Sequence, residues 1–98
     1  MKENNYAVYI ITNYNRTTFY VGVTGNLEAR LVQHIYKVIP DSFSSKYHLN
    51  RLVYYEFYDY INDAIAREKQ LKNWHRQWKI NLIQQINPDM IDLLTGEE

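Results

Sequence analysis

Two apolar runs near the N-terminus constrain the fold of this chain most. Residues 6–12 (YAVYIIT) and 17–23 (TTFYVGV) are rich in β-branched and aromatic side chains, and each has the length of a short strand. The residues between them, Asn13-Tyr14-Asn15-Arg16, favour a turn because asparagine tolerates left-handed backbone. The pattern predicts an antiparallel hairpin. Gly22 inside the second run predicts a bulge or a close approach to the backbone at that point.

Helical periodicity and a third strand-like run complete the pattern. Asn26 is the expected N-cap of a helix that Pro40 ends. We expect the last helix to bury Trp78, Leu82 and Ile83. The β-β-α-β-α-α order predicts an α+β fold, in which a small, three-stranded, mainly antiparallel sheet is flanked by helices. In chain order, the later elements are a polar loop over residues 41–50, a strand over 52–57, helices over 64–72 and 77–85, and an apolar tail over 90–94 that packs back.

Length and composition narrow the class of protein. At 98 residues the chain suits one domain, which we expect to span residues 1–98 with a core over about 6–94. Cysteine is absent, which excludes disulfide bonds and cysteine-based zinc sites and agrees with a cytoplasmic location. No apolar run approaches the roughly 18 residues of a membrane span, so we expect no membrane partner.

The charge pattern bears on nucleic-acid binding. The formal net charge is zero, whereas nucleic-acid-binding domains usually carry excess basic charge. The charges are unevenly distributed, however, because cations crowd residues 67–79 and acids gather over residues 89–98. A neutral total can therefore hide a basic face and an acidic tail. The alternative is an ordinary solvated helix surface.

Five residues form the constellation that suggests chemistry. Tyr9 and Tyr20 lie on the two strands of the expected hairpin, and Arg30 and His34 lie one turn apart on the helix that follows. Glu68 is a carboxylate in the next helix. Cutting a phosphodiester needs an activated water, charge neutralisation at phosphorus and help for the leaving oxygen. These residue types can supply all three.

Each of these residues also has an ordinary structural interpretation. The two tyrosines can be core aromatics, and the arginine and histidine can be solvated helix residues. Glu68 can be a surface partner of Lys72 at i,i+4, an interaction that contributes about 0.2–0.5 kcal/mol. Spacing alone favours the structural interpretation for Glu68, and for the tyrosines both interpretations stay open; the resemblance of the whole ordered set to a known family favours the functional one.

The set resembles the GIY-YIG nuclease superfamily, and in particular its small, stand-alone, single-domain bacterial members. Ala7-Val8-Tyr9 takes the place of the first tripeptide of the family, and Tyr20-Val21-Gly22 takes the place of the second. Tyr20 follows Tyr9 by eleven positions, and Arg30 follows Gly22 by eight. Residues 45–47, 52–56 and 67–72 also resemble this subgroup. Members of the family cut DNA in repair, recombination, restriction and intron homing.

The resemblance implies a DNA endonuclease that depends on Mg²⁺ or Mn²⁺. It makes Glu68 the metal ligand and Tyr9 the residue that orients or deprotonates water, with Tyr20 assisting. Arg30 would hold a phosphate oxygen, because a guanidinium stays charged. His34 would relay a proton or contact the phosphate. The asparagine that ends the family pattern has three candidates here, Asn73, Asn81 and Asn87.

Substrate contacts are expected from a glycine and four cations. Phosphate contacts of this kind position nucleic acid without reading its sequence, so we expect structure-selective or weakly specific cleavage. Two alternatives remain open on the same fold. One is a catalytically silent nucleic-acid-binding module. The other is a protein-interaction module that uses a tyrosine-rich surface to meet a larger repair protein or a second copy. The expected substrate-binding residues are Gly22, Lys46, Lys69, Lys72 and Arg76.

Overall fold

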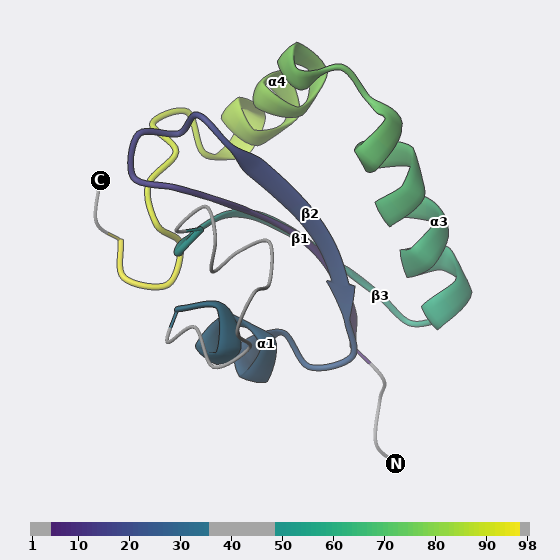
Figure 1. Cartoon of the computed structure of the whole chain (residues 1–98). Helices are drawn as coiled ribbons and strands as arrows, with labels where there is room; N and C mark the ends of the chain where they lie inside the picture. The colour runs from purple at the N-terminus through teal and green to yellow at the C-terminus, as the bar shows by residue number, and fades with distance from the viewer. Residues whose placement is uncertain (1–4, 36–48, 97–98) are drawn as a thin grey trace.

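The fold is built on a small antiparallel sheet. The computed structural model describes residues 5–35 and 49–96, with only the backbone of residues 33–35. The sheet has three strands, β1 (Tyr6–Thr12), β2 (Phe19–Thr24) and β3 (Arg51–Tyr58), in the order β2-β1-β3. Both neighbours pair antiparallel with β1 (Figure 1). The central strand is therefore the one that carries Tyr9.

Three helices in the described part of the chain cover the two faces of this sheet. Helix α1 (Leu27–Ile35) follows β2, and α3 (Ile61–Asn73) and α4 (Arg76–Ile86) follow β3. Alternate residues of β1 point to opposite faces. Tyr9 and Ile11 pack with Leu31 of α1, whereas Val8 and Ile10 pack with residues of α3 and α4. The predicted α+β class is confirmed, as is the order of the elements described. The predicted helix end at Pro40 and most of the predicted loop over residues 41–50 lie outside the described residues.

A single asparagine organises the turn of the hairpin. The Asn13 side-chain oxygen accepts hydrogen bonds from the backbone N–H groups of Thr17, at 2.8 Å, and of Thr18, at 3.1 Å. Arg16 adopts the left-handed conformation, with φ of 57°. Because Asn13 occupies these two amides, β2 begins at Phe19, two residues later than the sequence predicts.

The helix boundaries are close to the expected ones, with one error in burial. Asn26 caps α1 as predicted, since its side-chain oxygen accepts a hydrogen bond from the Ala29 amide at 3.1 Å. Helix α3 begins at Ile61, three residues before the predicted start at residue 64. The apolar pattern did not reveal this first turn because the turn is exposed. The prediction that Trp78 is buried is wrong: 53% of this residue is exposed, and it packs edge-on against Trp74 with ring centroids 5.8 Å apart.

The C-terminal tail packs back on the sheet, as predicted. The Leu93 amide donates to the Leu52 carbonyl at 2.8 Å. The buried Asn87 amide group donates to the Val53 carbonyl at 3.0 Å and binds both backbone groups of Ile91. These bonds fix the end of α4 against β3. No helix in the described part of the chain is long and apolar enough to span a membrane.

Candidate functional site

Tyr9 lies at the centre of the candidate site. It is fully buried in the middle of β1, where its Cα pairs with Gly22 of β2 and Tyr55 of β3. Its ring lies directly over Gly22, because a Cβ built on that glycine would overlap Tyr9 Cζ and Oη. The close approach that Gly22 predicted is thus made by the side chain of Tyr9. Gly22 leaves the room that Tyr9 needs, and its role in binding substrate remains a prediction.

Arg30 reaches Tyr9 from α1. The guanidinium donates a hydrogen bond to the Tyr9 hydroxyl, and the Arg30 side chain is only partly exposed. Local structure fixes this placement, because Asn26 caps the first turn and Leu31, the residue after Arg30, is buried against the sheet. The Arg30 amide also bonds to the Asn26 carbonyl at 3.1 Å. The first turn of α1 therefore places the Arg30 guanidinium, a permanent cation, against the Tyr9 hydroxyl.

Tyr20 stands next to Tyr9 on the edge strand. The two ring centroids are 6.4 Å apart and the ring planes are tilted by 48°. The pKa of Tyr9 is raised to about 12: burial is the largest cause, the neighbouring Tyr20 and Glu68 also raise it, and Arg30 opposes the rise. At neutral pH the Tyr9 phenol is therefore protonated. It can orient a water molecule as it stands, and it can act as a base only when added positive charge lowers its pKa.

Glu68 faces the same cluster from α3. Its negative charge contributes to the raised pKa of Tyr9. The Glu68 carboxylate also pairs with the Lys72 ammonium at 2.6 Å, one helical turn away. Only 13% of the Glu68 side chain is exposed, against 48% for Lys72. The i,i+4 pair expected from the sequence exists, but its carboxylate is mostly buried rather than on a solvated surface.

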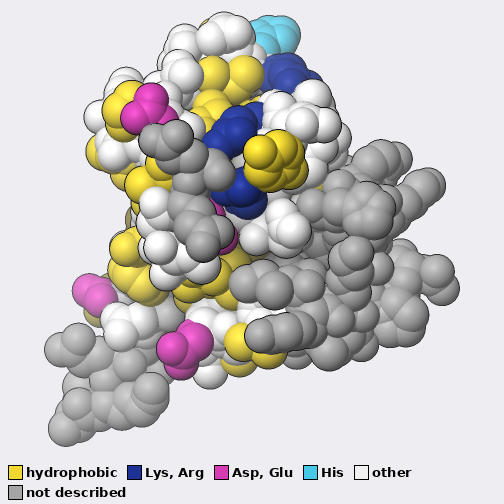
Figure 2. All heavy atoms as spheres, turned by 90° about the vertical axis from the view of Figure 1, so that its left-hand side faces the viewer, with side chains coloured by type: hydrophobic (Ala, Val, Ile, Leu, Met, Phe, Trp, Pro, Cys, Tyr) yellow, Lys and Arg dark blue, Asp and Glu magenta, His cyan; other side chains and the backbone are white. Residues whose placement is uncertain are grey.

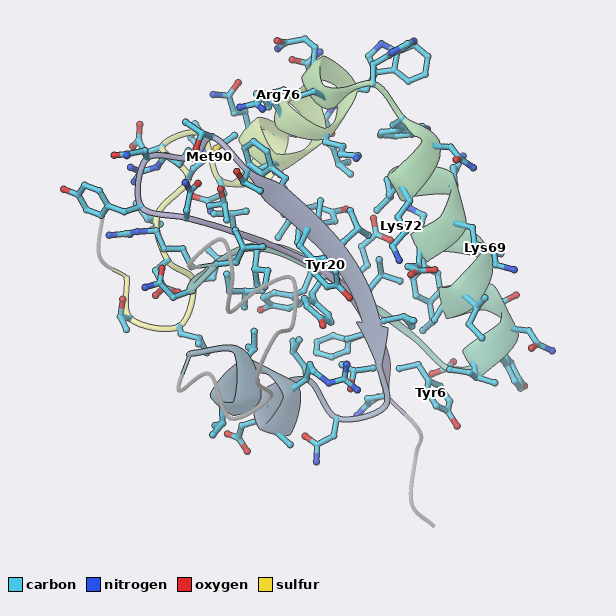
Figure 3. The ribbon with its side chains drawn as sticks, in the orientation of Figure 1. Tyr6, Tyr20, Lys69, Lys72, Arg76 and Met90 are labelled. Atoms are coloured by element: carbon cyan, nitrogen blue, oxygen red, sulfur yellow. The ribbon has the colours of Figure 1, made fainter. Side chains whose placement is uncertain are left out.

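Lys72 connects Glu68 to Tyr20. Its ammonium lies 5.8 Å from the centroid of the Tyr20 ring, and Figure 3 shows the side chain directed from α3 toward the sheet. Lys69 points the opposite way, from the outer side of α3, and is exposed. The structure therefore brings Lys72 into the cluster and leaves Lys69 outside it.

A second carboxylate, which the sequence analysis missed, sets the rotation of α3. Arg67 donates to Glu56 of β3 through Nη2 at 3.0 Å and through Nε at 3.1 Å. The hydroxyls of Tyr54 and Tyr58 also donate to Glu56. Burial alone would raise the pKa of Glu56, but these hydrogen bonds outweigh it and hold the pKa below its usual range. Because Arg67 precedes Glu68, this network helps to hold Glu68 toward Tyr9.

The sequence carried a signal for this network. Tyr54, Glu56 and Tyr58 alternate along β3, so they share one face of the strand. A charged residue between two tyrosines on a face that packs against a helix needs a partner of opposite charge. The same alternation places Tyr55 and Phe57 on the other face, which is the face of Tyr9. There they are 41% and 56% exposed, with ring centroids 5.3 Å apart.

The donor set fits a divalent cation that keeps most of its water. Among the residues described, no three His, Cys, Asp or Glu side chains gather into a metal cluster. Glu68 is the carboxylate beside Tyr9, and the Tyr9 and Tyr20 hydroxyls add neutral oxygen atoms. Mg²⁺ commonly binds through one or two carboxylates, several waters and substrate phosphates. Glu68 would be its protein ligand, with the Lys72 ammonium displaced from the carboxylate.

The remaining predicted residues fall into three groups. The His34 side chain and Lys46 lie outside the described residues. Arg76 lies at the N-terminal end of α4, where it bonds the Thr17 carbonyl at 2.6 Å rather than joining the cluster around Tyr9. Of the asparagine candidates, Asn87 uses its whole amide group on backbone partners, which assigns it a structural role. Asn81 bonds Gln77 at 3.0 Å, and Asn73 is exposed at the end of α3.

The basic residues do not form the single face that their sequence clustering suggested. Arg67 is bound to Glu56, Lys72 to Glu68, and Lys69 points outward. Figure 2 nevertheless shows Lys and Arg side chains gathered on the upper part of one face. The neutral net charge therefore does include a local basic region. Asp92 does not contribute to the expected acidic tail, because it is buried and accepts a hydrogen bond from the Leu94 amide at 3.0 Å.

Comparisons with known proteins agree with this geometry. The chain is similar to a UPF0213 protein of Syntrophus aciditrophicus (strain SB), with 35% identity over 91 residues that cover 89% of this chain and 97% of the relative. Its fold is similar to the solution NMR structure of a UPF0213 protein from Bacillus halodurans, with a TM-score of 0.58 at 19% identity over 96% of this chain and 99% of the other. The sequence model of the GIY-YIG catalytic domain matches residues 5–81, which span Tyr9, Tyr20, Arg30 and Glu68. The chain therefore belongs to the GIY-YIG nuclease family.

Proposed function

We propose that the protein is a divalent-metal-dependent endonuclease that hydrolyses phosphodiester bonds in DNA. One observation carries the proposal: four residues from β1, β2, α1 and α3 meet around the Tyr9 hydroxyl. Arg30 bonds to this hydroxyl, and Tyr20 and Glu68 act on it electrostatically. A fully buried phenol in contact with a cation, close to a largely buried carboxylate, is an arrangement typical of functional sites.

In this proposal each residue has a step. Arg30 would hold a non-bridging phosphate oxygen and stabilise the negative charge that develops on it. The Tyr9 and Tyr20 hydroxyls would orient the attacking water in line with the bond that breaks. The bond between phosphorus and the attacking oxygen forms as the bond to the leaving oxygen breaks. The attacking water gives up a proton to the surrounding water, and the leaving oxygen takes one up from it. When bound at Glu68, the cation supplies additional positive charge at the phosphate and the leaving oxygen.

Selectivity for nucleic-acid shape rather than sequence forms part of this proposal. The cations near the site suit phosphate oxygens, which carry no sequence information. The exposed Tyr55 and Phe57 rings, on the same sheet face as Tyr9, suit stacking against bases of any type. Both features favour weakly specific or structure-selective cleavage.

Cleavage of a substrate panel tests the proposal. Single strands, duplexes, flaps and junctions would be incubated with Mg²⁺, with Mn²⁺ and with chelator. Glu68→Gln and Arg30→Ala would be compared with Glu28→Gln, which removes an exposed carboxylate from the first turn of α1. We expect metal-dependent cutting by the wild type and by Glu28→Gln, and a loss of about 10²–10³-fold in each site variant.

Two results would contradict parts of the proposal. Metal-dependent cleavage that survives unchanged in Glu68→Gln would remove Glu68 from the mechanism. A folded wild-type protein that binds DNA but cuts no substrate with either metal would favour the second candidate, a non-catalytic nucleic-acid-binding module. The Glu68–Lys72 ion pair favours this candidate, because the ammonium already neutralises the carboxylate.

A further inference from the structure

A hollow lies where α4 passes the start of β2, on the sheet face that α3 and α4 cover. Its volume is about 270 Å³, and it is lined by Thr17, Thr18, Phe19, Arg76 and Lys79. Figure 3 labels Arg76 at this end of α4. One water molecule occupies about 30 Å³ in the liquid, so a hydrated anion of the size of phosphate fits in the hollow.

Arg76 is held in place at the rim of this hollow. Its Nη1 donates to the Thr17 carbonyl at 2.6 Å, and its Nη2 donates to the Arg16 carbonyl at 3.4 Å. The guanidinium carbon lies 5.4 Å from the centroid of the Phe19 ring. Carbonyl oxygens and an aromatic face orient the guanidinium without neutralising it. Arg76 therefore presents a preorganised positive charge, which reduces the entropy lost when an anion binds.

Lys79 supplies a second cation to the same hollow. Its side chain is half-buried, and burial holds its pKa below the usual value. Within the described part of the chain, the ion pairs are Arg67–Glu56 and Lys72–Glu68, and neither involves a residue of the hollow. Two cations thus share a concave, partly desolvated space with no carboxylate lining it. Such a space favours an anion as its occupant.

The hollow and the candidate site lie on opposite faces of the edge strand β2. Phe19, which lines the hollow, packs on the face that α3 and α4 cover, whereas Tyr20 packs with Tyr9 on the face of α1. Arg76 lies over Phe19, and Lys72 reaches from α3 to the ring of Tyr20. Cations of α3 and α4 therefore lie against two successive residues of the edge strand.

We infer that this hollow is a second phosphate subsite, which binds the backbone of a nucleic-acid strand that passes over the edge strand β2. The inference rests on the proposed function, because the bound strand would be the substrate that is cut at Tyr9 and Arg30. The subsite holds the strand by its charge. Arg76 and Lys79 would each contact phosphate oxygens there.

Binding measured without cleavage tests the subsite directly. A fluorescein-labelled DNA 20-mer would be titrated with protein in chelator, at several salt concentrations, and the anisotropy recorded. Lys79→Gln would be compared with Arg51→Gln, which makes the same change of charge on β3, the opposite edge strand of the sheet. We expect Lys79→Gln to weaken binding by roughly three- to tenfold and to reduce the salt slope by about 0.7 for a single strand or about 0.9 for a duplex. Lys79→Arg should retain wild-type affinity, and Arg51→Gln should change little.

The outcomes separate this inference from the proposed function. Equal effects of Lys79→Gln and Arg51→Gln, in proteins with wild-type circular dichroism, would overturn the subsite. Inorganic phosphate that binds the wild type but not Lys79→Gln, without any difference in DNA affinity, would assign the hollow to a small phosphorylated ligand and also overturn it. In Mg²⁺, Lys79→Gln should raise the DNA concentration needed for half-maximal cleavage and leave the rate at saturation unchanged. A wild type that never cleaves, but loses affinity in Lys79→Gln as expected, would refute the proposed function and leave the phosphate-binding hollow supported.

Discussion

The contact between Gly22 and Tyr9 makes a sharp prediction for Gly22→Ala. The added Cβ would lie 2.8 Å from Tyr9 Cε1, at least 0.6 Å inside the 3.4–4 Å of ordinary contact, and closer still to Cζ and Oη. Tyr9 is fully buried, so its ring has no solvent-facing space into which to move. We expect Gly22→Ala to lower the free energy of unfolding by about 1–3 kcal/mol, the usual cost of overpacking. For a domain of this size, that corresponds to a fall in Tm of roughly 4–24 °C.

The same displacement should impair cleavage in the protein that remains folded. A ring that moves by about 1 Å carries its hydroxyl away from Arg30, and a misplacement of that size can cost about 10²-fold in rate. Thermal unfolding monitored by circular dichroism would give the stability, and cleavage well below the Tm would give the rate.

A double-mutant cycle identifies the cause of these losses. In a Tyr9→Leu background, the group that the new Cβ overlaps is gone, so Gly22→Ala should cost at least 1 kcal/mol less than it does alone. Gly25→Ala is the matched control, because a Cβ there meets Tyr6 only at 3.6 Å, an ordinary contact. Equal destabilisation by Gly22→Ala in both backgrounds, or wild-type stability and rate in the single variant, would refute the steric argument.

Three further variants test the site and its support. Tyr9→Phe keeps the ring over Gly22 but removes the hydroxyl. If Tyr9 is the base, the cleavage rate should fall about 10²-fold and should no longer rise about tenfold per pH unit. An unchanged pH–rate profile would exclude that role. The pKa of Glu56 is held below its usual value of 4.5 in the folded protein, so its network stabilises the protein above about pH 4.5, and this stabilisation is lost as the pH falls through the folded-state pKa. When Tm is measured from pH 6 to about pH 3, it should therefore fall less steeply in Glu56→Gln than in the wild type. Parallel curves for the two proteins would contradict this. Asn87→Ala should lower the free energy of unfolding by about 2–3 kcal/mol, or Tm by roughly 8–24 °C, with little change in the cleavage rate of the folded protein. A selective loss of rate would instead make Asn87 the terminal residue of the family pattern.

The hairpin and the first helix could be predicted because local patterns determine them. Alternating apolar runs, an asparagine-rich turn and an N-cap act within a few residues of the chain. The late start of β2 was missed for a physical reason: the Asn13 side chain takes the amides of Thr17 and Thr18, and strand propensity does not reveal this competition. The exposure of Trp78 was missed because an amphipathic pattern shows that a helix has an apolar stripe, but not how wide a stripe its neighbours cover.

The candidate site was predictable only in part. Family resemblance marked Tyr9, Tyr20, Arg30 and Glu68, and the structure places all four together. The sequence did not reveal that Gly22 makes room for the Tyr9 ring, that Glu56 and Arg67 hold α3, or that Lys79 shares a hollow with Arg76. Each of these depends on which elements meet in space. A local pattern cannot specify that without the topology of the whole fold.

The assembly of the site from four elements has a consequence during protein synthesis. The hairpin that carries Tyr9 and Tyr20 is local and can form soon after it emerges from the ribosome, and α1 brings Arg30 shortly afterwards. Glu68 is separated from Tyr9 by much of the chain and arrives only when α3 is made and docks on the sheet. A nascent chain that ends before α3 therefore holds Tyr9, Tyr20 and Arg30 without Glu68. Under the proposed mechanism, this order of elements along the chain would delay any cleavage until the domain is nearly complete.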